Sequence, residues 1–155
     1  MNFKITKRIF YQFLIPVFVA VVFEVIYKGL EISTFYNFLE NILFSMPLLS
    51  PIYFIANPKI QQGYTTLAFL LFCFSIYFET VYYYFFETYL SASSLFVVLD
   101  SNSSEAAEFL NFYVDYKVIT FSVLMLIVVV TSLSRFKIIQ SHFNKTSLPT
   151  RIKVS

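Results

Sequence analysis

Five polar residues of this chain have the chemistry to bind a positively charged group. Asp100, Asn102 and Glu105 lie in the segment SSLFVVLDSNSSEAAEFLNFY, whereas Glu24 and Glu79 interrupt long apolar stretches. Carboxylate and amide oxygens accept hydrogen bonds, and paired carboxylates suit an ammonium group. Acidic residues within membrane segments are costly and often functional. We therefore expect these five residues to bind a polar lipid head group. A second interpretation stays open for Glu24 and Glu79, that each lies close enough to the membrane surface to reach water.

The composition is that of an integral membrane protein. Of the 155 residues, 58% are hydrophobic and only 13% are charged, and the mean hydropathy is +0.71. A soluble domain carries about 25% charged residues. With only two glycines, helix interiors are hardly interrupted. We therefore expect these 155 residues to form a membrane domain and not a water-soluble one.

Four stretches have the length and composition of membrane-spanning helices, namely residues 9–27, 38–56, 65–86 and 118–133. We predict an all-α fold, an integral membrane bundle of four transmembrane helices. Pro47 and Pro51 predict a kink in the second helix, because proline cannot donate a backbone hydrogen bond. Prolines are tolerated in membrane helices, since neighbouring helices can satisfy the freed carbonyl groups. The basic and then apolar N-terminus also fits a signal peptide. It lacks a clear small-residue cleavage site, so we expect an uncleaved first span.

Charge segregation predicts the orientation in the membrane. Nine of the eleven basic residues fall on one side of the predicted spans, and all nine acidic residues fall on the other side or in the adjoining halves of spans. Cytoplasmic flanks are enriched in lysine and arginine. We therefore expect a multi-pass protein with both its N-terminus and its C-terminus in the cytoplasm. The insert at residues 91–116, between the third and fourth helices, would then lie outside.

The insert carries the pattern of an amphipathic helix. Asn102 and Glu105 have the spacing of a capping box, with asparagine in place of the usual serine or threonine. An apolar stripe at helical spacing follows, made of Ala106, Phe109, Leu110 and Tyr113. We expect an extracytoplasmic amphipathic helix that lies on the membrane surface and presents its acidic residues to water or to a head group.

Other reactive residues are few. Cys73 is the only cysteine and lies in an apolar run, so we expect a small buried side chain. Together with the single histidine, His142, it makes a zinc site within this chain improbable. The tyrosines at 82–84 are expected to anchor the helix at the membrane interface. An alternative for them is the wall of an amphiphile-binding groove.

The segment SSLFVVLDSNSSEAAEFL resembles the polar juxtamembrane motif of bacterial phosphoethanolamine transferases, which are inner-membrane enzymes of the alkaline phosphatase/sulfatase superfamily. The resemblance implies a membrane domain of five helices and a periplasmic catalytic domain with zinc and a threonine nucleophile. It also implies transfer of phosphoethanolamine from phosphatidylethanolamine to lipid A or another envelope glycan. Glu105 matches the motif glutamate that faces the active site. Val97 stands where some relatives have an asparagine.

The sequence departs from that family in having four expected spans instead of five. We therefore expect the whole chain, residues 1–155, to be the N-terminal transmembrane domain of such an enzyme, truncated before the catalytic domain and inactive alone. It would hold no catalytic residue and no cofactor, since zinc belongs to the missing domain. The expected partners are phosphatidylethanolamine and a separate catalytic domain or full-length paralogue, in the bacterial inner membrane. No nucleic-acid-binding motif occurs.

Two other functions stay open at this point. The chain fits a stand-alone small membrane scaffold or regulatory protein without catalysis. A small transporter or channel subunit is a third class, but the acidic residues gather on one side and no charged pair crosses the middle of the membrane. Loss of phosphatidylethanolamine binding in Glu105→Ala would favour the first two classes over the third.

Overall fold

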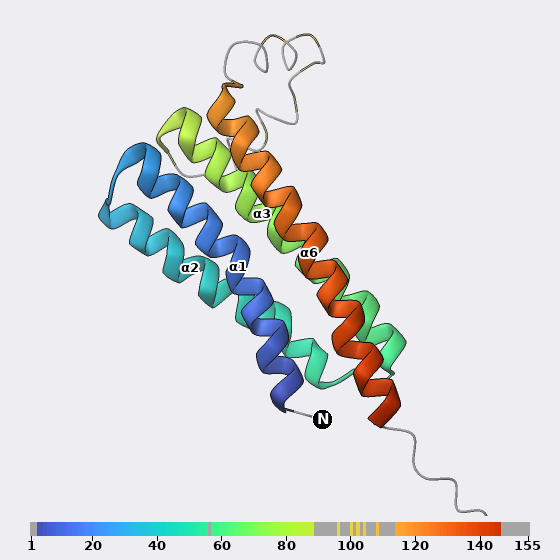
Figure 1. Ribbon diagram of the computed structural model, residues 1–155. Coiled ribbons are helices and arrows are strands. Elements are labelled where there is room, and N and C mark those ends of the chain that lie inside the picture. The colour runs from blue at the N-terminus through green and yellow to red at the C-terminus, as the bar shows by residue number, and fades with distance from the viewer. Residues whose placement is uncertain are drawn as a thin grey trace, which may run out of the picture.

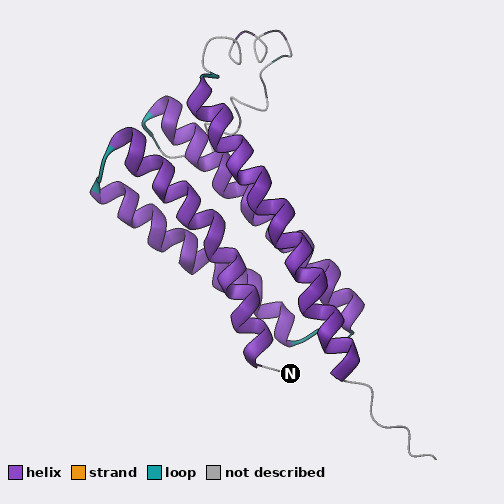
Figure 2. Ribbon diagram, in the orientation of Figure 1, coloured by secondary structure: helices purple, strands orange, loops and turns teal. Residues whose placement is uncertain are grey.

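The structure is a computed structural model that describes residues 3–55, 57–88, 96, 100, 102, 104, 108 and 114–146. Its elements are helices (Figures 1 and 2), and the prediction of an all-helical chain is confirmed for the described residues. They are the α-helices α1 (Phe3–Lys28), α2 (Ile32–Leu49), α3 (Pro58–Phe86) and α6 (Tyr116–Thr146), and the 3-10 helix η1 (Ser50–Tyr53). The predicted amphipathic helix of the insert falls mainly outside the described residues.

Successive long helices run in opposite directions. Figure 1 shows α1 beside α2 and α6 along α3, and α1 also contacts both α3 and α6. The first turn of the chain depends on Gly29, which has a φ of +87° and whose N–H donates to the carbonyl of Val25 at 3.1 Å. Glycine adopts this left-handed conformation without steric cost and commonly ends a helix in this way. The turn folds α2 back along α1.

The second helix ends earlier than the predicted 38–56 span. It begins at Ile32, ends at Leu49 and continues as η1, so the proline-containing stretch terminates the α-helix instead of only kinking it. Pro51 has no N–H to donate to the carbonyl of Pro47. The Ser50 hydroxyl donates to that carbonyl instead, at 2.9 Å.

Side-chain caps fix where the last two helices begin. Asn57 accepts a hydrogen bond from the Lys59 N–H at 3.0 Å and places Pro58 in the first turn of α3, the position that proline favours. At the start of α6, Asp115 Oδ1 accepts from the N–H groups of Lys117 and Val118, both at 3.0 Å. These caps extend both helices beyond the N-terminal ends of the predicted spans 65–86 and 118–133.

Aromatic rings fill the core between α1, α3 and α6. Phe69 packs against Phe13 with ring centroids 5.2 Å apart and against Phe136 at 5.1 Å, while Phe23 stacks on Phe121 at 4.4 Å. Such pairs add to the packing that holds membrane helices together, where burial from water contributes little. Cys73 is buried beside this core, as predicted.

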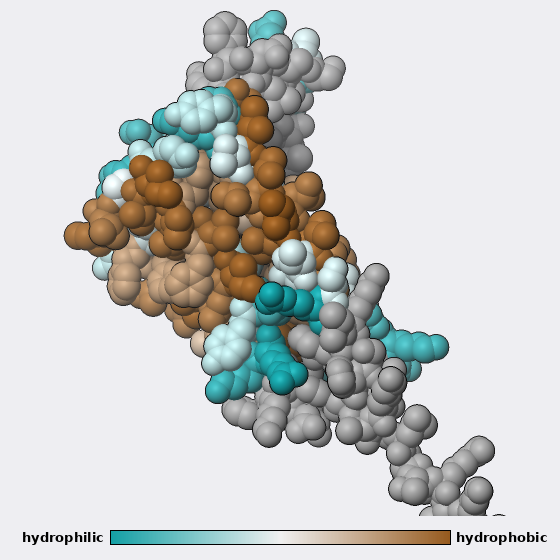
Figure 3. Space-filling view, viewed as in Figure 1, coloured by the Kyte–Doolittle hydropathy of each residue, from teal (hydrophilic) through white to brown (hydrophobic). Residues whose placement is uncertain are grey.

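Of the four α-helices in the described residues, three are long and apolar enough to cross a membrane. These segments are Lys7–Lys28, Lys59–Phe86 and Tyr116–Phe136. On the face in Figure 3, hydrophobic residues gather over the middle of the helices and hydrophilic residues lie towards both ends. Large apolar side chains such as Leu126 and Phe74 point outwards, 63% and 64% exposed. Such a surface belongs in lipid, so the chain is a membrane protein.

The helix α2 is not among the helices that are long and apolar enough to cross a membrane. With 18 residues it is about 27 Å long, close to the roughly 30 Å of a bilayer core. Its first half carries polar side chains, and its second half is mostly apolar. The polar residues are Ser33, Thr34, Asn37, Glu40 and Asn41. The structure therefore does not confirm α2 as a fourth span.

Candidate functional site: an acidic–amide cluster between three helices

Four polar side chains meet between α1, α2 and α3, and we name them the acidic–amide cluster: Glu24, Asn37, Asn41 and Glu79. The side-chain amide of Asn37 donates to Glu24 Oε1 at 2.9 Å. The Asn41 amide donates to Asn37 Oδ1 at 2.7 Å, and the Glu79 carboxyl of α3 lies near Asn41. Hydrogen bonds thus run from Glu24 through Asn37 to Asn41, and Glu79 lies beside the end of this line.

The α1–α2 hairpin places these residues opposite one another. Glu24 lies about one turn before the end of α1, and Asn37 lies in the second turn of α2, so they face each other across the turn at Gly29. Asn41 follows Asn37 by four residues and therefore lies on the same face of α2. Glu79 comes from the C-terminal part of α3, about two turns before its end.

Burial and charge set the chemistry of the cluster. Glu24 is only 4% exposed, and its second carboxyl oxygen, Oε2, has no hydrogen-bond partner among the described residues. The like charges of Glu24 and Glu79 repel each other, and so do those of Glu79 and Glu40. The positive charge of Lys28 attracts the Glu24 carboxylate. An unsatisfied buried oxygen beside a second carboxyl group favours a donor or a cation as ligand.

The structure brings together two of the five predicted site residues. Glu24 and Glu79 both belong to the cluster. Asp100 and Asn102 are exposed, and Asn102 Oδ1 accepts a hydrogen bond from the Ser104 hydroxyl at 2.6 Å. Glu105, the residue singled out by the resemblance, lies outside the described residues. Its predicted capping contact with Asn102 therefore stays a prediction.

Asn37 and Asn41 are not among the five predicted site residues. The predicted second span begins at Phe38 and therefore leaves Asn37 in the preceding loop. The available signal was the spacing of two amide side chains four residues apart beside an apolar run, which puts both on one helix face. That signal becomes specific only when Asn37 is known to lie across from Glu24.

A second polar group closes the same end of the bundle, which we call the acidic end. A cavity of about 380 Å³ is lined there by Tyr27, Lys28, Glu31, Tyr83 and Glu87. Lys28 Nζ donates to the carbonyl of Tyr83 at 2.7 Å and lies 4.0 Å from the centre of its ring. The Tyr83 hydroxyl donates to Glu31 at 3.2 Å. The same carbonyl also accepts the Glu87 N–H at 3.0 Å, so Lys28 is a second donor to the last turn of α3, a structural role.

The neighbouring tyrosine ties α3 to the start of α6. The Tyr84 hydroxyl donates to Asp115 Oδ2 at 2.8 Å, and Lys117 Nζ lies 5.9 Å from the centre of the Tyr84 ring. Desolvation alone would raise the pKa of Asp115, but bonds from the Val118 N–H, the Tyr84 hydroxyl and the Lys117 N–H, with the Lys117 charge, lower it below 3.8. Tyr83 is buried and Tyr84 half-buried, so these two tyrosines join helices within the bundle.

The described part of the chain contains no group of three or more His, Cys, Asp or Glu side chains arranged to hold a metal ion. The acidic–amide cluster offers hydrogen-bond acceptors and two carboxyl groups to a ligand. Comparison with known proteins finds no match to the chain among protein-family models, curated proteins or solved structures.

Proposed function

We propose that this chain is the lipid-binding membrane part of a phosphoethanolamine transferase-like protein, and that the acidic–amide cluster binds the ammonium group of phosphatidylethanolamine. The observation that carries the proposal is the buried Glu24 Oε2 without a described hydrogen-bond partner, next to a second carboxyl group on Glu79. A primary ammonium supplies three N–H donors and a positive charge, which are the two things this arrangement lacks.

The cluster also supports a choice between lipids. Asn37 holds one oxygen of Glu24 at 2.9 Å and leaves the other as acceptor. The quaternary ammonium of phosphatidylcholine has no N–H and cannot donate to that oxygen. The half-buried Glu79 gives the head group a first contact before it reaches the deeper Glu24. We expect phosphatidylethanolamine to bind more tightly than phosphatidylcholine.

The proposed orientation has both termini in the cytoplasm and α2 as a fourth transmembrane element. In Figure 1 the beginning of α1 and the end of α6 lie at the same end of the bundle, and this supports an even number of crossings. Basic residues at that end, including Lys7, Arg8 and Lys59, favour the cytoplasmic side. The acidic–amide cluster would then lie in the outer half of the bacterial inner membrane, on the side where we expect the insert at residues 91–116.

No catalytic residue is assigned to this chain. The transfer step, with zinc and a threonine nucleophile, would belong to a separate catalytic domain or a full-length paralogue. In this proposal the chain presents the donor lipid, and Asp100, Asn102 and Glu105 of the insert would contact its head group from outside. The acceptor would be lipid A or another envelope glycan.

Lipid binding by the purified chain tests the proposal. The chain would be placed in nanodiscs, and its affinity for phosphatidylethanolamine and phosphatidylcholine would be compared by native mass spectrometry. A hydrogen bond to a charged group contributes about 1.5–3 kcal/mol, so Glu24→Gln or Glu79→Gln should weaken phosphatidylethanolamine binding about tenfold or more. Binding of phosphatidylcholine should change little.

Glu87→Gln is the matched control, because Glu87 is an exposed carboxylate at the acidic end outside the cluster. It should leave both affinities unchanged. Equal affinity for the two lipids in the native chain would overturn the proposal, as would an unchanged preference in both cluster variants. A stand-alone scaffold would then be the better account.

A further inference from the structure

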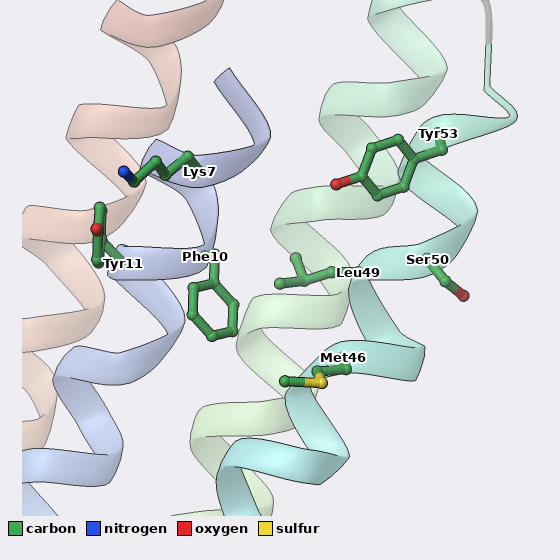
Figure 4. A pocket seen from close by; sticks show the side chains of 7 residues that line it. All are labelled: Lys7, Phe10, Tyr11, Met46, Leu49, Ser50 and Tyr53. Atoms are coloured by element: carbon green, nitrogen blue, oxygen red, sulfur yellow. The ribbon is translucent and has the colours of Figure 1, made fainter. Parts of the chain in front are cut away.

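A groove of about 460 Å³ opens at the opposite end of the bundle from the acidic–amide cluster. Figure 4 shows its position between the start of α1 and the junction of α2 with η1. Its volume falls in the range of about 300–1,000 Å³ that is typical of small-molecule sites. The side chains that shape it are Lys7, Phe10 and Tyr11 on one side and Met46, Leu49 and Tyr53 on the other.

The groove is polar at one end and apolar along its length. In Figure 4, Lys7 and Tyr53 lie near the open end of the two helices, while Phe10 and Met46 lie further along towards the middle of the bundle. Lys7 is also the first residue of the first membrane-crossing segment, Lys7–Lys28. We therefore expect its ammonium group, which lies 5.9 Å from the centre of the Tyr11 ring, at the level of the membrane surface, with the apolar walls extending from there into the membrane.

The walls face the membrane directly. Met46 is 51% exposed and Tyr53 is 52% exposed, so an occupant can enter sideways from the lipid phase. The nearby Ser50 hydroxyl is already donated to the carbonyl of Pro47 at 2.9 Å. This leaves Lys7 as the charged group at the polar end of the groove.

The charge around the groove has one sign. No acidic residue occurs in residues 1–23, 41–78 or 116–155, which include the parts of α1, α2, α3 and α6 at this end. Lys7 and its neighbour Arg8 are both exposed. A negatively charged head group is therefore the complementary ligand, and acidic lipids attract basic residues at the cytoplasmic surface.

We propose that this groove binds one anionic phospholipid of the inner leaflet. Its phosphate lies at Lys7, and one acyl chain lies along Phe10, Leu49 and Met46. The match rests on the order of polar and apolar groups along the groove and on the one-sided charge at its mouth. The choice of leaflet rests on the proposed orientation, whereas binding in the groove does not depend on phosphatidylethanolamine binding at the acidic–amide cluster, because it concerns different residues at the other end of the bundle.

The experiment compares binding of phosphatidylglycerol and phosphatidylcholine to the full chain in nanodiscs by native mass spectrometry. A hydrogen bond from one lysine ammonium to a phosphate contributes about a tenfold gain in affinity. Lys7→Gln should therefore weaken phosphatidylglycerol binding about tenfold, and Met46→Trp, which fills the groove, should weaken it clearly as well. Each substitution has a control that lies outside the groove: Arg8→Gln removes the same charge, and Leu43→Trp adds the same ring to an exposed position of α2.

Selective loss in Lys7→Gln and Met46→Trp, with both controls unchanged, would support the groove as the site. Equal losses in Lys7→Gln and Arg8→Gln would show a diffuse attraction and overturn the proposal. Unchanged binding in a correctly folded Met46→Trp protein would overturn it as well. Should Met46→Trp fail to fold by circular dichroism, the comparison of Lys7→Gln with Arg8→Gln decides alone.

Discussion

Asp115 holds the start of α6 by three contacts at once. One carboxylate oxygen accepts two backbone N–H groups at 3.0 Å, and the other accepts the Tyr84 hydroxyl at 2.8 Å. All three interactions favour the ionised carboxylate, and they lower its pKa against the opposing effect of desolvation. A single side chain therefore couples the order of one helix to the end of another.

Asp115→Ala should destabilise the folded chain at neutral pH by about 1 kcal/mol, the usual cost of losing an N-cap. Because the folded pKa is below the ordinary 3.8, the stabilisation is present above that pH and is lost as the pH falls through the folded pKa. The difference in thermal midpoint between the two proteins, measured by circular dichroism in detergent, should shrink in this acidic range.

Asp115→Asn separates the cap from its charge. Asparagine can still accept the two backbone hydrogen bonds but does not titrate. Its contribution to stability should therefore lack the acidic transition. A difference between the native chain and Asp115→Ala that persists unchanged at every acidic pH at which both proteins stay folded would contradict the titration argument.

At the scale of the helices, the two glycines of the chain should respond to alanine in opposite directions. Gly29 has a φ of +87° at the end of α1, whereas Gly63 lies inside α3, and an added Cβ meets nothing within 4 Å at either position. Gly29→Ala should cost about 1 kcal/mol because of its backbone conformation alone. Gly63→Ala should add about 0.5–1 kcal/mol, since alanine favours the helix.

The two alanine variants serve as controls for each other, because both add one methyl group in open space. The measurement is the shift in the thermal unfolding midpoint of each variant from the native chain, in the same detergent. Equal shifts of the same sign would mean that the turn at Gly29 does not need its left-handed conformation.

The long apolar helices could be predicted from the sequence, whereas α2 could not be placed correctly. The runs in α1, α3 and α6 have the length and hydropathy of spans, so pattern alone locates them. In α2 the first polar turns resemble a loop, and they are helical because Thr34 and Asn37 are buried. The two prolines also looked compatible with a continuous span, but the α-helix ends between them.

Half of the acidic–amide cluster could be predicted in the same way. An acidic residue in an apolar stretch stands out, and this singled out Glu24 and Glu79. The pairing of Glu24 with Asn37 at 2.9 Å depends on where the hairpin turns. The hydrophobic periodicity of a single helix cannot predict which residues of α1 and α2 face each other, because this depends on the position of the turn at Gly29.

For the molecule as a whole, the bundle predicts which loops share a side of the membrane. Leu30 and Thr88 lie at the acidic end, and Phe54 lies at the other end, between η1 and α3; all three are exposed. In a Cys73→Ala background, a single cysteine at each position would be treated with a membrane-impermeant maleimide. We expect Leu30→Cys and Thr88→Cys to react in right-side-out vesicles and Phe54→Cys to react only after permeabilisation.

This labelling pattern tests α2 and α3 separately. Reaction of Leu30→Cys and Phe54→Cys from the same side would show that α2 does not cross the membrane. Reaction of Phe54→Cys and Thr88→Cys from the same side would contradict the crossing of α3. The native chain is the control, since buried Cys73 should stay unlabelled while the protein is folded.

The separation of acidic and basic residues along the helices makes the chain an electric dipole parallel to the membrane normal. Lys7 and Arg8 stand at one end, and Glu31, Glu87 and Asp115 stand at the other. Moving one elementary charge across a membrane costs or releases about 2.3 kcal/mol per 100 mV. The resting voltage of an energised membrane, negative inside, therefore favours one orientation of this dipole over its inverse. Respiring cells should consequently insert the chain more uniformly than cells whose voltage has been collapsed by an ionophore.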